Sequence, residues 1–355
     1  MQSQSLLAFP VVLPQGDEDI LPTEVGVEIE LRCDDVDGNP INIWDLVDGS
    51  NNPSGESLVE GAGILTNEAG LHVAEFAVKH SSSISQIYTR ILAHQAWVQN
   101  LVGSEVRWDF SEFDEVLSRP VKLDDWAPKT RYVAMLKAYR EKARRQGEVF
   151  REQGFLDMVL WRSTHFNIGL TDEHKAIVLL DILNLVSPWA YTYWRDRLGR
   201  PATRRVLDAY GWEPKGFEPG WRVFGTLENY FTWLTAQRRL VRSDSDGKNF
   251  EVDLETPYQV GDNVSEIHHW ARLRPGRVEW RVMFSMSPTE VVHFLNWLRP
   301  VLQNLLELLE LVPERAPSDV RSMAFNALHR RWPEVFPVSE PDEAEWNRAA
   351  ERCCI

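Results

Sequence analysis

The chain has 355 residues, 43% of them hydrophobic, which is enough to build a sizeable core in one large domain or in two closely packed ones. Its 53 acidic and 38 basic residues give a formal net charge of −15, which disfavours nucleic acid and anionic membranes as partners. The three cysteines, Cys33, Cys353 and Cys354, have the spacing of neither a disulfide framework nor a zinc site. No stretch approaches the roughly 20 apolar residues of a membrane helix, and residues 1–16 lack the basic start of a signal peptide, so a cytoplasmic protein is expected.

The first third of the chain predicts two strands and a helix. Residues 24–33 alternate apolar and polar side chains, as a strand with one packed face does, and residues 34–40 (DDVDGNP) predict a turn that would close a first hairpin. Residues 51–63 predict a loop, and residues 71–79 predict a second strand. A helix is expected over residues 81–102, whose opening serines are favourable N-caps.

The rest of the chain is predicted to be mostly helical, with two further strands. Helices are expected over 131–154, 171–189 (ending where Pro188 interrupts it), 200–210, 227–240, 289–312 and, as two short pieces, in the tail at 315–355. Strands are expected within 159–170 and over 276–285. Since helices follow the strands without regular crossovers, the predicted fold class is α+β with a mostly antiparallel sheet.

Two further features bear on the architecture. No glycine-rich loop of the GxGxxG or GxxxxGK type follows any predicted strand, which disfavours a Rossmann or P-loop nucleotide fold. We expect residues 1–312 to form a single catalytic domain and residues 313–355 to form a helical extension packed on it.

The chemistry of the chain is concentrated on the polar faces of the predicted strands. In GVEIEL, Glu28 and Glu30 are two residues apart and point the same way, while Val27, Ile29 and Leu31 point oppositely. Neighbouring carboxylates repel each other unless solvent or a cation compensates them, and Mg²⁺ prefers oxygen ligands of this kind. For this segment alone, the ordinary interpretation is a half-exposed strand whose glutamates face water.

Three other predicted strands show the same alternation. It pairs Glu279 with Arg281, His165 with Asn167, and Glu75 with Lys79. Taken singly, these pairs are typical of a surface ion pair, a satisfied core histidine and a solvated strand. Taken together in one sheet, the four strands would collect acids for metal ions and an arginine for a transferred phosphate, which is what phosphoryl transfer requires.

At these residues the chain resembles the glutamate–cysteine ligase superfamily, especially its type 2 branch of bacterial carboxylate–amine ligases, whose fold is similar to that of glutamine synthetase. The matching pieces, in family order, are GVEIEL, the strand with Glu75, HFNIGL, Ser187 with Pro188, FGTLENYFTWL and HHWARLRPGRVEWRVM. They extend over most of residues 24–305. The resemblance implies an open active-site funnel formed by the sheet and backed by helices.

The resemblance also implies roles for individual residues. The matched metal ligands are Glu28, Glu30, Glu75, His165 and Glu279. Arg281 would contact phosphate and act with Glu279 in catalysis, and Arg272, Arg274, Lys79 and Asn167 would complete the cofactor-binding set. The implied cofactors are ATP and Mg²⁺, which Mn²⁺ can replace. The chain departs from the family where Asn167 replaces a second histidine, and where Met283 and Phe284 replace an acidic residue, which affects the expected specificity.

The implied reaction is ATP-dependent amide formation through an acyl phosphate, with glutamate or a similar amino acid as the activated carboxylate and a small molecule, peptide or carrier as the source of the amine. Two alternatives remain open: a kinase of a small acceptor without ligation, and a non-catalytic binding protein of the same fold. The glycine-containing stretches 49–63 and 243–263 are candidates for a loop that covers the intermediate. The identity of the amine does not follow from the sequence. The oligomeric state does not follow from it either, and a homo-oligomer is one of the open possibilities.

Overall fold

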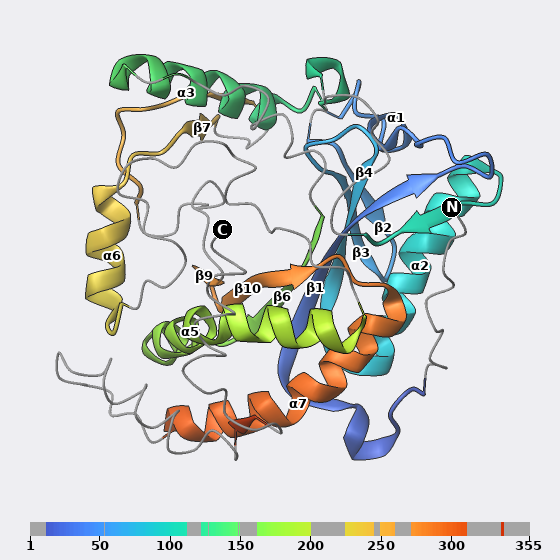
Figure 1. The fold of residues 1–355 in the computed structure, drawn as a ribbon, viewed down its shortest axis with the longest axis vertical. Helices are drawn as coiled ribbons and strands as arrows, with labels where there is room; N and C mark the ends of the chain where they lie inside the picture. Colours follow the sequence, from blue (N-terminus) through green and yellow to red (C-terminus); the bar gives the residue numbers. More distant parts are fainter. Residues whose placement is uncertain are drawn as a thin grey trace.

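The computed structural model describes residues 12–52, 54–111, 122–126, 128–147, 149, 162–199, 224–244, 249–259, 271–310 and 335–336. Within them the predicted α+β fold class is confirmed (Figure 1). The main sheet has eight strands in the order β2-β3-β4-β1-β6-β10-β9, with β5 paired to the end of β1. Every pair of neighbouring strands in it is antiparallel.

The strands of this sheet are β1 (Ile20–Asp34), β2 (Glu56–Val59), β3 (Gly63–Asn67), β4 (Val73–Ser83), β5 (Arg107–Asp109), β6 (Ser163–Gly169), β9 (Ala271–Arg274) and β10 (Arg277–Phe284). A separate two-stranded sheet is formed by β7 (Val241–Ser243) and β8 (Phe250–Val252). The α-helices are α1 (Ile43–Leu46), α2 (Ile84–Val102), α3 (Thr130–Gln146), α5 (Glu173–Arg197), α6 (Leu227–Ala236) and α7 (Pro288–Glu310). Two short 3-10 helices cover Gly16–Asp19 and Leu123–Asp125.

The helix ends follow from local sequence signals. Helix α2 begins after Ser83, whose hydroxyl accepts a hydrogen bond from the Gln86 backbone N–H at 3.1 Å. It ends at Gly103, which takes the left-handed conformation with φ 71°. Helix α3 stops in the same way at Gly147, with φ 67°, so it is shorter than the predicted 131–154.

The prediction that the helix ends at Pro188 was wrong for helix α5. The helix continues to Arg197, with a bend of 55° between the two parts. A proline in a helix costs about 3 kcal/mol, because one backbone hydrogen bond is lost and the ring meets the preceding turn. Tyr191 and Trp194 beyond the bend are buried in the core, and the burial of two such large side chains offsets that cost.

Other expectations were wrong in detail. The first hairpin does not form: after the turn, the chain makes only an isolated bridge between Asp34 and Pro40, and β1 pairs instead with β4, β6 and β5. The stretch 51–63 contains β2, an edge strand, so it is part of the sheet and not a free loop. Helix α6 ends at Ala236, before the predicted residue 240, because Gln237 is already extended. The helices predicted at 200–210 and in the tail at 315–355 lie outside the described residues, apart from Val335 and Phe336.

The apolar face of the main sheet forms the core. Val27 and Ile29 of β1 are fully buried, in a cluster that includes residues of α2, α5 and α7. Phe294 of α7 stacks on Phe166 of β6, with ring centroids 4.3 Å apart. A smaller apolar cluster joins α3 to the β7–β8 ribbon, which lies beside it in Figure 1. Three helices thus cover one face of the sheet and leave its polar side chains on the other.

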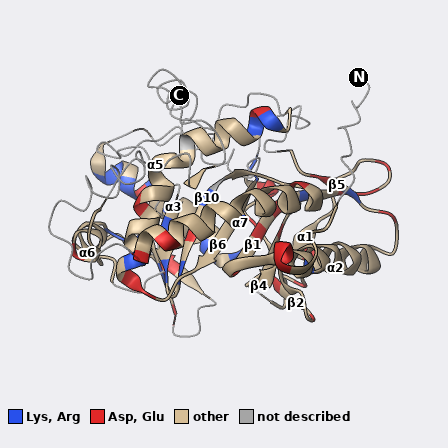
Figure 2. Ribbon diagram, turned by 90° about the horizontal axis from the view of Figure 1, so that it is seen from below, with Lys and Arg blue, Asp and Glu red and all other residues tan. Residues whose placement is uncertain are grey.

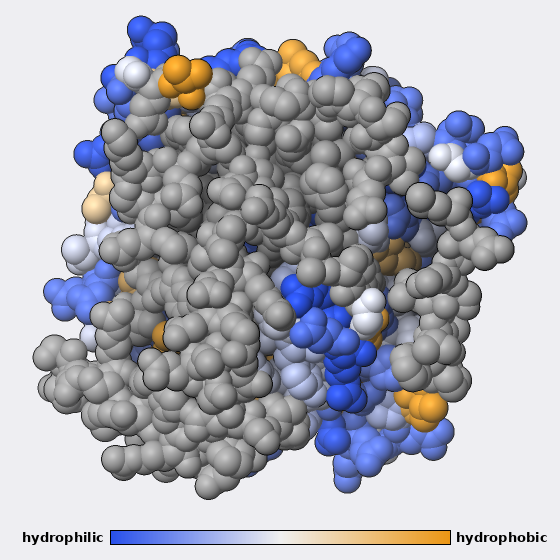
Figure 3. All heavy atoms as spheres, in the orientation of Figure 1, coloured by the Kyte–Doolittle hydropathy of each residue, from blue (hydrophilic) through white to orange (hydrophobic). Residues whose placement is uncertain are grey.

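The described surface carries both signs of charge. Acidic and basic residues are interspersed along the elements, and α3 carries both (Figure 2). Most of the described surface visible in Figure 3 is hydrophilic, with hydrophobic residues only as isolated spots. Within the described residues, no single helix combines the length and apolar composition needed to cross a membrane, and only the two parts of α5 on either side of the bend meet that requirement together.

Candidate functional site

The register of the main sheet places the predicted polar residues in one row. Across β4 and β1, Glu75 is paired with Glu30, and across β1 and β6, Glu28 is paired with His165. Side chains of directly paired residues lie on the same face of a sheet. All of these side chains therefore lie on the face opposite the core.

The row continues toward the other edge of the sheet. Asn167 of β6 is paired with Glu279 of β10, and Glu279 is paired with Arg272 of β9. The four strands that the sequence singled out, β4, β1, β6 and β10, are direct neighbours in one sheet. Acidic groups lie toward the β4 side of the row, and arginines lie toward the β9 side.

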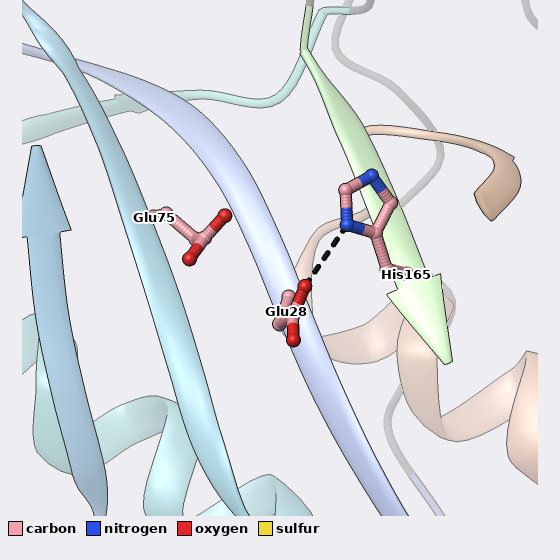
Figure 4. A group of neighbouring side chains, drawn as sticks. All are labelled: Glu28, Glu75 and His165. Atoms are coloured by element: carbon pink, nitrogen blue, oxygen red, sulfur yellow. Dashed lines mark hydrogen bonds and ion pairs between the residues drawn. The ribbon is translucent and has the colours of Figure 1, made fainter. Parts of the chain in front are cut away.

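One group of possible metal ligands consists of Glu28, Glu75 and His165 (Figure 4). One potential ligand atom from each lies within 4.8 Å of the others. The Nδ1 atom of His165 is 3.0 Å from Oε2 of Glu28. In Figure 4 the three side chains come from three adjacent strands and converge on one place, with Glu28 in the middle.

A second group shares Glu75 and adds Glu30 and Glu68, again within 4.8 Å. Glu68 was missed in the sequence because it lies one residue beyond the end of β3, where the alternating pattern has stopped. Ser163, also missed, holds Glu30 in place: its backbone N–H and its hydroxyl both donate to Oε2 of Glu30 at 2.8 Å. The same hydroxyl is 2.7 Å from Nε2 of His165, so it links the two groups.

The acids of these two groups repel one another. Burial, followed by the charges of Glu68, Glu28 and Glu30, raises the pKa of Glu75 well above its ordinary value. Burial also raises the pKa of Glu30. The pKa of Glu28 is lowered although burial opposes this, because Glu28 accepts a hydrogen bond from His165.

The donor set fits a hard divalent cation. Four glutamates on a partly buried face offer carboxylate oxygens, and His165 offers an imidazole nitrogen. The glutamates are Glu28, Glu30, Glu68 and Glu75. Mg²⁺ and Mn²⁺ prefer such ligands, and a bound cation would relieve the repulsion that raises the pKa of Glu75. The second group also has a neighbour from α3, because Tyr132 donates a hydrogen bond to Glu68. Lys129, just before α3, donates to the Thr66 hydroxyl at 3.0 Å.

The basic part of the row surrounds Glu279. Arg272 donates to this carboxylate twice, from Nε at 2.7 Å and from Nη2 at 2.8 Å, and Arg274 donates from Nε at 2.8 Å. The Nε atom of Arg281 is 3.6 Å from Oε1. Although burial raises it, the pKa of Glu279 lies well below its ordinary value because of the charges of Arg272 and Arg281. Burial lowers the pKa of Arg272 to about 9, which leaves the guanidinium charged at neutral pH.

The remaining predicted residues differ in their surroundings. Asn167 is buried and donates to Oε1 of Glu28 at 2.9 Å, so it connects the acidic and basic parts of the row. Lys79 is exposed in the middle part of β4, four residues after Glu75. Met283 and Phe284, which stand where the resembled family has an acid, are both buried in the core. The acid is therefore not replaced by another polar group at these positions.

We expect the affinity for Mn²⁺ to increase with pH, because a cation that binds Glu75 has to displace its proton. The raised pKa means that Glu75 keeps this proton at a higher pH than an unfolded glutamate does. In the absence of metal, protonated Glu75 therefore contributes to the free energy of unfolding. This contribution is fully present below about pH 4.3, the pKa of an unfolded glutamate, and is lost as the pH rises through the pKa of Glu75 in the folded protein. Calorimetric titration with Mn²⁺ from about pH 5 to about pH 8 would measure the change in affinity.

The control for this titration is Glu75→Gln, which cannot take up the proton. It should bind Mn²⁺ more weakly at every pH and with a flatter dependence on pH. An affinity of the unsubstituted protein that stays constant over this range would exclude Glu75 as a ligand.

No protein-family model and no curated protein sequence matches the chain. Among solved structures, it is similar to a bifunctional glutathione synthetase from Pasteurella multocida, with 13% identity and a TM-score of 0.45, over 93% of this chain and 47% of that protein. It is also similar to a glutamate–cysteine ligase from Francisella tularensis in complex with AMP, with 14% identity and a TM-score of 0.43, over 94% of this chain and 79% of that one. A third match is the complex of the prokaryotic ubiquitin-like protein Pup and its ligase PafA, with 13% identity and a TM-score of 0.33, over 94% and 63%. The chain spans about half the length of the glutathione synthetase.

Proposed function

We propose that this protein is an ATP- and magnesium-dependent ligase that joins a carboxylate, such as that of glutamate, to an amine. The observation that carries the proposal is the row on the polar face of the sheet, in which two acidic groups that share Glu75 lie beside arginines around Glu279. Carboxylates in this number suit Mg²⁺, and guanidinium groups suit phosphate and carboxylate oxygens. Phosphoryl transfer needs both on one surface.

The acidic residues of the row would hold the cation. Bound there, Mg²⁺ would neutralise phosphate charge and polarise the bond to the transferred group. Glu28 and His165 keep each other oriented through their 3.0 Å contact, and Asn167 holds the other oxygen of Glu28. These contacts hold the two side chains beside each other, and a cation that binds both would replace the hydrogen bond between them.

Arg281 would stabilise charge on the transferred phosphoryl group. Its side chain is 22% exposed, whereas that of Glu279 is completely buried, so the guanidinium lies at the accessible edge of the row. In this scheme the substrate carboxylate attacks phosphorus and the amine then displaces phosphate from the acyl carbon, so no residue of the chain acts as a nucleophile. The residues of the row bind, orient and neutralise charge.

A direct test is to offer pairs of amino acids with ATP and Mg²⁺, and to measure both ADP release and the amide product by mass spectrometry. We expect amide formation that stops in excess EDTA and survives a chelator selective for zinc, because the donor set contains no thiolate. Full turnover in excess EDTA would contradict the proposal.

The same assay separates the two alternatives. A kinase of the same fold would give ADP and a phosphorylated acceptor without an amide. A non-catalytic binding protein would bind ATP without releasing ADP. Either result would replace the ligase proposal.

A further inference from the structure

Glu279 is surrounded differently from the other acids of the row. Its side chain is completely buried, and both of its oxygens accept hydrogen bonds from guanidinium groups: Oε2 from Arg272 and Arg274, and Oε1 from Arg272. Charge-assisted bonds of this kind are among the strongest hydrogen bonds in proteins. These bonds take three of the roughly four acceptor sites of the carboxylate, and the Nε atom of Arg281 lies 3.6 Å from Oε1, so arginines dominate the surroundings of Glu279.

The hairpin β9–β10 builds these contacts into the fold. Its two-residue turn, Pro275 and Gly276, has Gly276 in the left-handed conformation, with φ 70°. The register that follows pairs Arg272 directly with Glu279. Among the described residues, Glu279 belongs to neither of the two groups whose ligand atoms converge within 4.8 Å.

Arg272 has a donor that the described residues do not use. Its Nη1 atom is buried without a hydrogen-bond acceptor, although the guanidinium as a whole is fixed by Glu279. A buried donor without an acceptor is costly, and an oxyanion is the usual partner of a charged guanidinium. The side chains of Arg274 and Arg281 are 17% and 22% exposed, so they form the accessible edge of the same cluster.

We propose that Glu279 is a positioning residue and not a metal ligand: it fixes Arg272 and Arg274 so that this arginine cluster binds an oxyanion of a substrate, either a phosphate or a carboxylate. The inference rests on the proposed function for the identity of that substrate, but not for the role of Glu279. It departs from the role that the family resemblance implies for this residue.

Binding of Mn²⁺ to the full-length protein, followed by electron paramagnetic resonance of the free ion, tests the first part. Glu279→Gln alone leaves the buried arginines without their carboxylate and can prevent folding. The informative variant is therefore Glu279→Gln combined with Arg272→Gln, which removes one charge of each sign. We expect its dissociation constant for Mn²⁺ to stay within about threefold of that of the unsubstituted protein, whereas Glu28→Gln should raise the constant by about tenfold or more.

An equal loss of Mn²⁺ affinity in the double variant and in Glu28→Gln would show that Glu279 is a ligand and would overturn the inference. Arg272→Gln alone is the matched control, because it removes the arginine and keeps the carboxylate. This measurement is independent of turnover. A protein that makes no amide would overturn the proposed function and leave the assignment of Glu279 standing.

Calorimetric titration with inorganic phosphate and with acetate tests the second part. Binding of phosphate would assign the cluster to the nucleotide, and binding of acetate alone would assign it to the acid substrate. In either case, Arg272→Gln should weaken binding by about tenfold or more, and Arg107→Gln, which removes one exposed cation on β5 of the same sheet, should not. Failure of both anions to bind, or equal binding by Arg272→Gln, would overturn the oxyanion site.

Discussion

Glu28→Gln is expected to lower the rate of ATP turnover by about 100-fold or more without unfolding the protein. Loss of groups that only support a metal ligand typically costs 10- to 100-fold in metal affinity or activity, and Glu28 itself is a proposed ligand. Its side chain contacts His165 and Asn167 on the polar face, while Val27 and Ile29 on the opposite face make the core contacts of the strand. The substitution therefore changes the chemistry of the row and leaves the packed face intact. Steady-state measurement of ADP release checks the rate, and circular dichroism checks the fold.

Glu24→Gln is the matched control for this variant. Glu24 lies on the same strand, carries the same charge and is exposed, so its loss should leave turnover within about twofold of that of the unsubstituted protein. If Glu28→Gln and Glu24→Gln have the same turnover, Glu28 holds no catalytic cation. If Glu28→Gln unfolds, the hydrogen bonds to His165 and Asn167 are structural, and Glu75→Gln becomes the variant that tests the metal site.

The polar face could be predicted because strands have a side-chain period of two. Glu28 with Glu30, and His165 with Asn167, are each separated by one apolar residue, so their common face follows from the spacing alone. That β4, β1, β6 and β10 are direct neighbours in one sheet does not follow from spacing, because pairing between distant segments depends on the packing of the whole core. The alternation in the four segments suggested that they share one sheet, but it did not give their order in it.

Residues outside the alternating pattern of the strands were not identified from the sequence. Glu68 lies beyond the end of β3, where a single acid cannot be told from a solvated loop residue. Ser163 is the first residue of β6, and its bonds to Glu30 depend on the β1–β6 pairing. Lys129 reaches Thr66 from a segment more than 60 residues away. Contacts of this kind come from tertiary structure and leave no local signal.

The environment of Glu279 was only partly predictable. The family resemblance implied that Arg272 and Arg274 bind the cofactor, and the turn at Pro275 and Gly276 contains enough information to set the hairpin register. The sequence does not show that the carboxylate is completely buried with both oxygens occupied by arginine, since burial depends on elements that cover the strand from elsewhere in the chain.

Trp280→Ala is expected to lower the free energy of unfolding by about 3–5 kcal/mol, which is a large share of the roughly 5–15 kcal/mol that stabilises a typical domain. Trp280 is 1% exposed and lies on the core face of β10, with its ring centroid 5.8 Å from that of Phe294. Its Nε1–H also donates to the Ser187 hydroxyl at 2.8 Å, so truncation removes a hydrogen bond as well as opening a cavity. Urea unfolding followed by circular dichroism measures the change, since tryptophan fluorescence would itself be altered by the substitution.

Trp280→Phe separates the two contributions to this loss. It keeps an aromatic ring against Phe294 and removes the hydrogen bond to Ser187, so it should lower the free energy of unfolding by only about 1–2 kcal/mol. Both variants should keep the turnover per folded molecule within a small factor, because Trp280 points away from its neighbours Glu279 and Arg281 on the polar face. A Trp280→Ala protein of unchanged stability that has lost turnover would contradict the separation of the core and the catalytic row onto opposite faces of the sheet.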